Sequence, residues 1–230
     1  MKELLTNSVF FGAFVSLAAY EIGVWVKKKS GWAICNPLLI AIILVIGVLL
    51  ALQIPYDVFE EGAQYISYLL TPATVCLAVP LYEQVELLRK HKKAIAAGLL
   101  AGMLTSLLSI LLLAALFQLN HEEYVTLLPK SITTAIGMGV SEELGGLVTV
   151  TVAVIIMTGV VGNIVAESVC RLFRLEEPVA KGIAIGSASH AIGTAKAMEM
   201  GEVEGAMSSL SIAVTGLITV AGAALFAGLW

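Results

Sequence analysis

The sequence predicts an all-α membrane protein that crosses the bilayer several times. Hydrophobic residues make up 59% of its 230 residues, charged residues only 13%, and the mean hydropathy is +0.96. Soluble proteins use about a quarter charged residues, so this composition lies outside their range. Because lipid offers the backbone no hydrogen-bond partners, such a chain spans the membrane as helices. We expect a single transmembrane domain over residues 1–230, with about seven crossings and one re-entrant hairpin.

Five apolar runs are long enough to cross the membrane, since a spanning helix needs about 20 mostly apolar residues. They cover residues 4–26, 33–53, 94–118, 146–170 and 206–229. The first run follows Lys2 but has no small-residue cleavage site. We therefore interpret residues 1–30 as a retained N-terminal span rather than a signal peptide.

Three further segments are interrupted by residues that weaken helices. Residues 65–88 contain two prolines, residues 182–204 contain several glycines, and residues 126–144 combine Pro129 with glycines and a Ser/Thr cluster. Irregular backbone at membrane depth is tolerated only where protein or a water-filled cavity surrounds it. We therefore expect the functional site in these three segments.

The basic residues predict the orientation, because short cytoplasmic loops are enriched in lysine and arginine. Most of the 13 lysines and arginines fall in three loops, at residues 27–29, 89–93 and 171–181. With these loops in the cytoplasm, the N-terminus lies outside and the C-terminus inside. The acidic loop at residues 122–123 then faces outward.

The same charge map assigns different paths to two polar segments. Residues 126–145 must enter and leave on the outer side, which predicts the re-entrant hairpin. Residues 182–204 must cross outward from Lys181, which places Glu204 outside and Lys196 nearer the outer surface than the midplane.

A plain span, an interrupted span and a plain span follow one another in residues 33–118 and again in residues 146–229. Because the two triplets start on opposite sides, they form inverted repeats of element types, with little residue identity. Inverted repeats with paired broken helices are typical of secondary transporters, whose binding sites lie near the membrane midplane.

Hydroxyls, a histidine and a lysine lie together in the sequence GSASHAIGTAK of the last interrupted segment. Ser187, His190 and Thr194 share one helical face, with Ser189 beside them. Lys196 joins that face only if the helix breaks between them. One interpretation is a broken helix whose free amides and hydroxyls bind a small anion. The other is a kinked structural helix whose lysine extends to the membrane interface.

His190 has two interpretations of its own. It is either a proton-coupling group, since a pKa of about 6.5 permits titration near neutrality, or a core histidine with satisfied hydrogen bonds. Ser187 and His190 could also pair a nucleophile with a base, but this spacing is common by chance and no orienting acid lies nearby. Two of the three histidines lie in predicted loops. We therefore expect neither an enzyme nor a bound metal or cofactor.

The other two interrupted segments supply further candidates. Pro129 favours a helix start beside hydroxyls and a cation, which suits an anion, although an interfacial loop with a solvated lysine is the alternative. The candidates in these two segments are Thr71, Thr74, Pro80, Lys130, Ser131, Thr133 and Thr134.

Four motifs resemble those of the LrgB/CidB family, which is called antiholin-like in bacteria. They are NPLL at 36–39, PATVCLAVPLYEQ at 72–84, LPKSITTAIGM at 128–138 and GSASHAIGTAKAMEMGEVEGAMSSL at 186–210. The resemblance covers nearly the whole chain, which is also similar to the membrane half of the plastidal glycolate/glycerate translocator. One departure is Ala135 with Gly137, where some members have proline and alanine.

The resemblance implies a multi-pass protein of the bacterial cytoplasmic membrane, often working with a small holin-like partner of the LrgA/CidA type. It implies traffic in small monocarboxylates such as pyruvate, glycolate, lactate or acetate, beside older proposals of control over murein hydrolase export and cell lysis. The family's functional residues fall on Pro80, Lys130, Ser131, Thr133, Thr134, Ser187, His190, Thr194 and Lys196.

We expect a secondary transporter that holds a small monocarboxylate by helix-end amides, hydroxyls and Lys130 or Lys196, with alternating access. Both lysines lack an obvious buried acidic partner in their own segments, so a substrate carboxylate can supply the missing charge. The alternative is an antiholin-like regulator of a holin-like partner. Small residues in the last span permit close helix contact, within one chain or in a homo-oligomer. No nucleic-acid-binding pattern is present.

Overall fold

The computed structural model is helical throughout the part of the chain that it describes, which is every residue except 1–7, 9, 33–34, 70–71, 73–74 and 77. The all-α prediction is confirmed for these residues. The helices are α2 (Phe11–Ser30), α3 (Pro37–Leu52), α4 (Tyr56–Ser67), α6 (Ala78–Glu83), α7 (Val85–Phe117), α8 (His121–Leu127), α9 (Thr134–Glu143), α10 (Val148–Leu172), α11 (Pro178–Met200) and α12 (Glu202–Ala227). The chain divides into two compact units, unit 1 (Met1–Cys76) and unit 2 (Leu77–Trp230).

Unit 1 is built from α2, α3 and α4. The side chain of Asn36 caps α3 by accepting hydrogen bonds from the amides of Leu38 (2.9 Å) and Leu39 (3.2 Å), which satisfies two of the free donors at the helix start. Gly12 and Gly23 of α2 face the backbones of α4 and α3 so closely that a side chain at either position would collide. α2 therefore packs against both neighbours with its backbone in contact.

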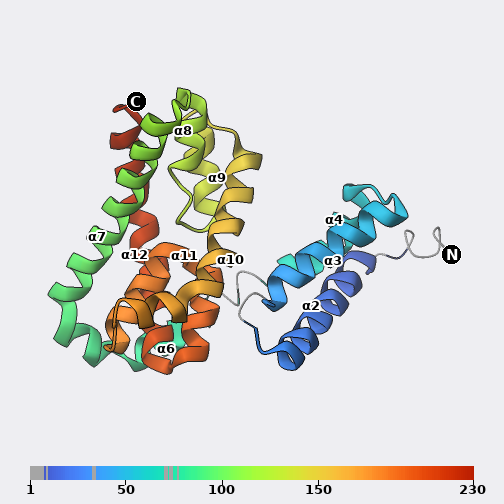
Figure 1. Cartoon of the computed structure of the whole chain (residues 1–230), viewed down its shortest axis with the longest axis horizontal. Helices are drawn as coiled ribbons and strands as arrows, with labels where there is room; N and C mark the ends of the chain where they lie inside the picture. Colours follow the sequence, from blue (N-terminus) through green and yellow to red (C-terminus); the bar gives the residue numbers. More distant parts are fainter. Residues whose placement is uncertain (1–7, 9, 33–34, 70–71, 73–74, 77) are drawn as a thin grey trace. The chain divides into compact units, whose positions relative to one another are not determined.

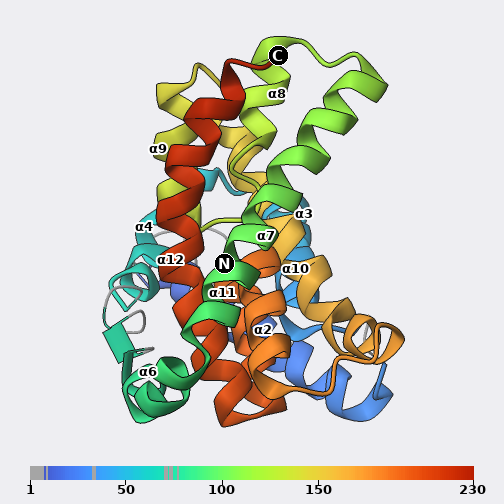
Figure 2. The same ribbon diagram turned by 90° about the vertical axis from the view of Figure 1, so that its left-hand side faces the viewer.

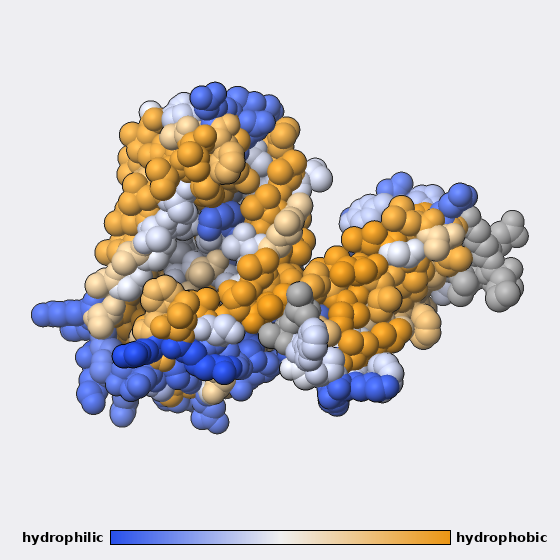
Figure 3. All heavy atoms as spheres, in the orientation of Figure 1, coloured by the Kyte–Doolittle hydropathy of each residue, from blue (hydrophilic) through white to orange (hydrophobic). Residues whose placement is uncertain are grey.

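Three helices in the described part of the chain are long and apolar enough to cross a membrane, namely α7, α10 and α12. Many of their large apolar side chains are exposed, including Leu112 (70%) and Leu217 (72%). In unit 2, hydrophilic residues gather at two ends and apolar residues cover the surface between them (Figure 3). An apolar surface of this extent fits a lipid environment, so the chain is a membrane protein. The number of crossings stays a prediction.

The long helices connect two ends of unit 2, which we call the basic end and the C-terminal end. α7 runs from its basic first turns to Phe117 and lies alongside α12 (Figure 2). At the C-terminal end, Nε1 of Trp230 donates to the carbonyl oxygen of Leu119 (2.8 Å). The hydroxyl of Tyr124 donates to the carbonyl oxygen of Phe226 (2.9 Å). The end of the chain therefore lies beside the end of α7.

The first hairpin consists of α8, α9 and the turn between them, and it begins and ends at the C-terminal end. A capping box between Asn120 and Glu123 starts α8. After α9, the amide of Leu147 donates to Oγ1 of Thr126 (2.8 Å), and Oγ1 of Thr151 donates to the carbonyl oxygen of Thr126 (2.9 Å). The segment therefore turns back to the end where it began, as the sequence predicts.

The second hairpin lies within α11, because the backbone of His190 leaves the helical region with φ 43° and ψ −131°. Before this break, the first arm runs parallel to α12, since Gly182 lies against Glu204 and Gly186 against Ser208. After the break, the second arm runs antiparallel to the same helix.

Two contacts establish the antiparallel direction of the second arm. Thr194 is hydrogen-bonded to Ser208 (2.7 Å), whereas Met198 lies against Gly205, earlier in α12. α11 therefore begins at the basic end, reverses at His190 and returns to the basic end.

The prediction that residues 182–204 cross outward is therefore wrong. Oε1 of Glu204 lies 3.9 Å from Nζ of Lys181, so both are at the basic end. α12 then runs to the C-terminal end, where Trp230 lies beside Leu119. The sequence predicts the C-terminus inside the cell and the loop at residues 122–123 outside. Because the structure places both at the same end of unit 2, these two predictions conflict. The physical reason is that this polar segment, although long enough to span the membrane, folds back on itself at His190.

In unit 2, the two hairpins enter from opposite ends and each lies between long helices (Figure 1). This arrangement relates residues 126–145 to residues 182–204 as inverted elements. The predicted repeat at residues 33–118 extends over both units and includes positions outside the described residues, so it stays a prediction, as does the single domain.

Candidate binding site at the hairpin tips

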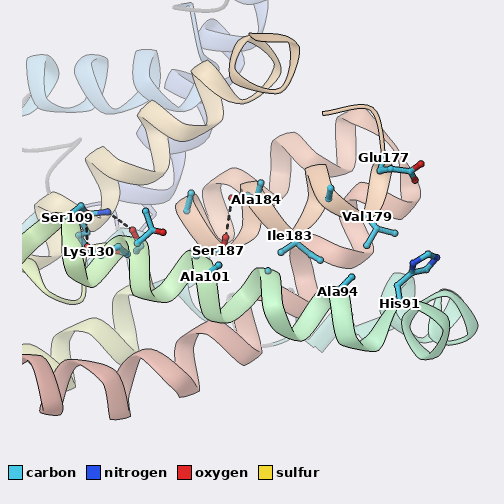
Figure 4. Close-up of a pocket in the computed structure, with 17 residues that line it drawn as sticks. His91, Ala94, Ala101, Ser109, Lys130, Glu177, Val179, Ile183, Ala184 and Ser187 are labelled. Carbon is cyan, nitrogen blue, oxygen red and sulfur yellow. Dashed lines mark hydrogen bonds between the residues drawn. The ribbon is translucent and has the colours of Figure 1, made fainter. Parts of the chain in front are cut away.

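A cavity of about 670 Å³ in unit 2 extends to the tips of both hairpins. Its walls are α7, the first arm of α11 and the turn between α8 and α9. Figure 4 shows His91 and Glu177 at one end of the cavity and Lys130 and Ser109 at the other. Since His91 and Glu177 belong to the basic end, the cavity leads from that end to the hairpin tips.

Lys130 is the cation at the deep end of the cavity. It lies in the turn of the first hairpin, is half-buried, and donates from Nζ to Oγ of Ser131 (2.8 Å). Within the described part of the chain, ion pairs form at Arg171, Lys181 and Lys196 but not at Lys130. A lysine at membrane depth costs about 2.5–3.5 kcal/mol on insertion scales and is usually retained for a partner. A bound anion would supply that partner.

Lys130 also lines a second hollow, of about 450 Å³, on the α10 side of the hairpin tips. Ser189 and Gly162 line this hollow as well, whereas Ser187 lines the main cavity. The two serines of the second tip therefore lie on opposite sides of it. Lys130 lines both spaces, so this residue is accessible from either side of the tips.

Hydroxyl groups line the deep part of the main cavity, at Thr105, Ser106 and Ser109 of α7 and at Ser131 and Ser187 of the tips. Oγ of Ser106 is buried and has no hydrogen-bond partner among the described residues. A buried donor without a partner costs about 1–3 kcal/mol, which a polar ligand would offset. The rest of the lining is mainly alanine and glycine, with Val179 and Ile183, which suits a small ligand with an apolar body.

Glycines allow two flanking helices to approach the second tip closely. A Cβ atom on Gly102 of α7 would lie 2.8 Å from Oγ of Ser187, and one on Gly162 of α10 would overlap the side chain of Ser189. Any larger residue would displace the tip, because Cβ contacts below 3.0 Å are essentially not seen. These glycines therefore fix the position of the tip between α7 and α10.

His190 and Thr194 lie behind the tip, against α12, rather than in the cavity. Oγ1 of Thr194 donates to the carbonyl oxygen of His190 (2.8 Å) and shares a hydrogen bond with Oγ of Ser208 (2.7 Å). The His190 side chain is 3% exposed, and neither ring nitrogen has a partner among the described residues. Among the described residues, no group supplies the hydrogen bonds that the interpretation of His190 as a satisfied core histidine requires.

Lys196 does not line either hollow but pairs with carboxylates. Its Nζ lies 2.7 Å from Oε1 of Glu167 on α10 and 3.1 Å from Oε2 of Glu199. Glu199 lies in the segment of Lys196 but is exposed, and Glu167 belongs to α10, so neither is a buried partner within that segment. The predicted position of Lys196 near the outer surface is wrong. The reversal at His190 brings Lys196 back toward the basic end, where Glu167 also pairs with Arg171 (3.1 Å).

The remaining predicted residues are not brought into the site by the described structure. Thr133 and Thr134 begin α9 just beyond the tip and do not line the cavity. Thr71 and Thr74 lie outside the described residues, as does the side chain of Pro80 in α6.

Sequence reasoning missed the contribution of α7, because this helix is an uninterrupted apolar span. The available signal was the spacing of Thr105, Ser106 and Ser109, which places hydroxyls close together on an otherwise aliphatic helix. Gly98 and Gly102, spaced four residues apart, were a second signal for close helix contact.

Comparisons with known proteins point to one family. The model of the LrgB-like family matches residues 16–229. A protein of Bacillus cereus (strain B4264), named antiholin-like protein LrgB, is 36% identical over 216 residues, which cover 94% of each chain. The protein of the same name from Bacillus anthracis (strain CDC 684 / NRRL 3495) shows the same identity and coverage. No solved structure matches the chain.

Proposed function

Since this chain belongs to the LrgB-like family, we propose that it is a secondary transporter that carries a small monocarboxylate across the bacterial cytoplasmic membrane. The main support is Lys130, a half-buried cation without an acidic partner among the described residues, located between the hairpin tips and lining the hollows on both sides. A substrate carboxylate bound there would neutralise the lysine.

The lining favours one carboxylate on a small body. Lys130 provides a single positive charge, and Ser106, Ser131 and Ser187 provide hydroxyls around it. A second carboxylate would have no cation in this part of the cavity and would be costly to desolvate. Pyruvate, glycolate, lactate and acetate each have one carboxylate and only two or three carbons in total, so they match this chemistry.

Alternating access would use the two hairpins. In secondary transporters with inverted repeats, one set of elements moves against the other around a fixed midplane site. Here the main cavity leads to the basic end, which the distribution of lysine and arginine assigns to the cytoplasm. We therefore assign this conformation to an inward-facing state, with the C-terminus of unit 2 outside.

Antiholin-like regulation is the second candidate function. The names of the Bacillus relatives favour it, and they do so more directly than they favour transport. In this role the chain would restrain a small membrane partner of the LrgA/CidA type and thereby limit murein hydrolase export and lysis. Lys130 would then have a structural or partner-binding role.

Counterflow in proteoliposomes tests transport. Purified protein is reconstituted with unlabelled pyruvate or glycolate inside, and entry of the labelled compound is measured without any ion gradient. We expect saturable entry in the wild type and a Kd about 10- to 100-fold weaker for Lys130→Gln, since a hydrogen bond to a charged group contributes about 1.5–3 kcal/mol. The matched control is Lys92→Gln, which alters an exposed lysine at the basic end.

The same preparation distinguishes regulation from transport. Absence of saturable entry in the wild type, together with reduced conductance of a co-reconstituted holin-like partner, would favour antiholin-like regulation. Equal affinity in Lys130→Gln and wild type would remove the proposed binding site while leaving transport in place.

A further inference from the structure

His190 is a buried titratable residue that the proposed anion site does not use. It forms the break of α11, its side chain is 3% exposed, and it lines neither hollow. Both ring nitrogens lack partners among the described residues. Leaving such groups unpaired costs about 1–3 kcal/mol each, and holding a residue other than glycine at φ 43° costs a similar amount. Both costs arise at one residue, directly behind the tip that the proposed anion site uses.

A continuous polar face of α12 leads from the basic end to His190. It consists of residues spaced four, three, four and four positions apart, all no more than 8% exposed: Glu204, Ser208, Ser211, Thr215 and Thr219. Glu204 pairs with Lys181 at the basic end. Next to Thr215, a Cβ on Gly216 would lie 3.9 Å from Cε1 of His190. The hydroxyl of Thr215 is also buried without a partner among the described residues.

The charged groups on the surrounding helices lie away from this face or are already paired. On α10 and the second arm, Glu167, Lys196 and Glu199 form ion pairs with one another. α7 has no charged residue after Lys93, and α12 has none after Glu204. Glu142 and Glu143 end α9 and are exposed.

The first hairpin contributes one cation, Lys130, on the other side of the tip. Among the described residues of unit 2, no unpaired carboxylate therefore lies opposite a protonated His190. The anion bound at Lys130 would be its nearest counter-charge, so each would favour binding of the other, a reciprocity that linkage requires.

From this geometry we infer that His190 is a protonation site, loaded along the polar face of α12, and that its proton travels together with the anion held at Lys130. A ring nitrogen gains the proton on loading and loses it on release, and no bond of the anion changes. Chains of aspartate, glutamate and histidine serve as proton relays in other membrane transporters, and here Glu204 and His190 are the titratable groups at the two ends of the polar face. Proton and monocarboxylate together form a neutral cargo, which the membrane potential neither drives nor opposes. This inference rests on the proposed transport function.

Two assays on the same proteoliposomes separate this inference from the transport proposal. Counterflow without a gradient measures transport alone, and uptake driven by a gradient of one pH unit, acid outside, measures coupling. We expect the wild type to accumulate labelled pyruvate up to about tenfold, because one pH unit corresponds to a tenfold ratio. We expect His190→Gln to retain counterflow and to accumulate only about onefold. His121→Gln, at an exposed histidine of α8, should behave as the wild type.

A pH-sensitive dye in wild-type liposomes measures the proton directly and depends on no variant. Proton entry on addition of pyruvate supports the inference, whereas counterflow without proton movement overturns it and leaves transport standing. Gradient-driven accumulation by His190→Gln equal to the wild type also overturns it. If His190→Gln shows no counterflow, Thr215→Val decides, since this near-isosteric change alters the polar face alone. Slower accumulation with normal counterflow supports the inference, and unchanged accumulation overturns the relay.

Discussion

The two hairpins of unit 2 reverse the chain in different ways. The first uses two separate helices joined by a turn, and local signals mark it: the Asn120–Glu123 capping box and Pro129. The second reverses at His190 within an apparently continuous helix, and only its packing against α10 and α12 accounts for the turn. The stability of the first hairpin therefore depends mainly on its own capping and turn residues, whereas that of the second depends on close contact with its neighbours.

The largest expected effect comes from filling the contact between α10 and the second tip. Gly162→Val would place a branched side chain where Ser189 lies, and overpacking of this kind costs about 1–3 kcal/mol. We expect lower thermal stability in detergent and loss of counterflow. The matched control in the first hairpin is Gly139→Val, since nothing lies within 4 Å of a Cβ at Gly139. Equal losses in the two variants would contradict the proposed difference between the hairpins.

The next effect concerns the backbone conformation at His190. It is tested by comparing the thermal stability of two variants that both lack the imidazole. In an ordinary helix, glycine is about 1 kcal/mol less stable than alanine. At φ 43° and ψ −131° the order should reverse, because alanine is strained there and glycine is not. We expect His190→Gly to unfold at a higher temperature than His190→Ala.

A control at Ala195, in the helical second arm, calibrates this comparison. There, Ala195→Gly should lower the unfolding temperature. If alanine were also the better residue at position 190, the break in α11 would be ruled out as a fixed feature of the fold.

A capping change tests the local nature of the first hairpin. Asn120→Ala removes the side chain that accepts from the amide of Glu123 (2.9 Å), and loss of such a cap costs about 1 kcal/mol. We expect a modest fall in unfolding temperature with counterflow retained. Asn120→Asp should restore most of the stability, because aspartate caps equally well. A loss of transport as large as that of Gly162→Val would contradict this prediction.

The smallest effect should follow from Lys196→Gln. Lys196 joins the second arm to Glu167 of α10 (2.7 Å), but Glu167 and Glu199 are partly exposed, and such ion pairs contribute about 1 kcal/mol or less. We expect a small loss of stability that shrinks further at high salt, measured by thermal unfolding. A loss of substrate affinity comparable with that of Lys130→Gln would return Lys196 to the binding site.

Features that rest on local chemistry could be predicted from the sequence, and features that rest on distant contacts could not. Apolar runs predict α7, α10 and α12, and the distribution of lysine and arginine predicts that residues 126–145 return to the end where they began. The reversal at His190 has no proline and no glycine at the turning residue. It depends on α12, whose backbone lies against Gly182 and Gly186.

The missed reversal had a direct effect on the predicted site. A straight helix would place Lys196 well beyond His190 toward the outer surface, whereas the folded arm returns it to Glu167. Lys130 lies in the turn of a hairpin that the distribution of basic residues predicts, and the structure places it in the lining of both hollows. Its role in binding an anion stays a prediction, whereas Lys196 lines neither hollow.

The dependence of the second hairpin on α12 has a consequence for biosynthesis. α11 precedes α12 in the sequence, so its two arms leave the ribosome before the helix that hydrogen-bonds to Thr194 and packs against Gly182 and Gly186. Before α12 is present, Thr194 lacks its partner Ser208, and Gly182 and Gly186 lack the backbone against which they pack. We therefore expect the second hairpin to take its final position only after α12 has entered the bilayer.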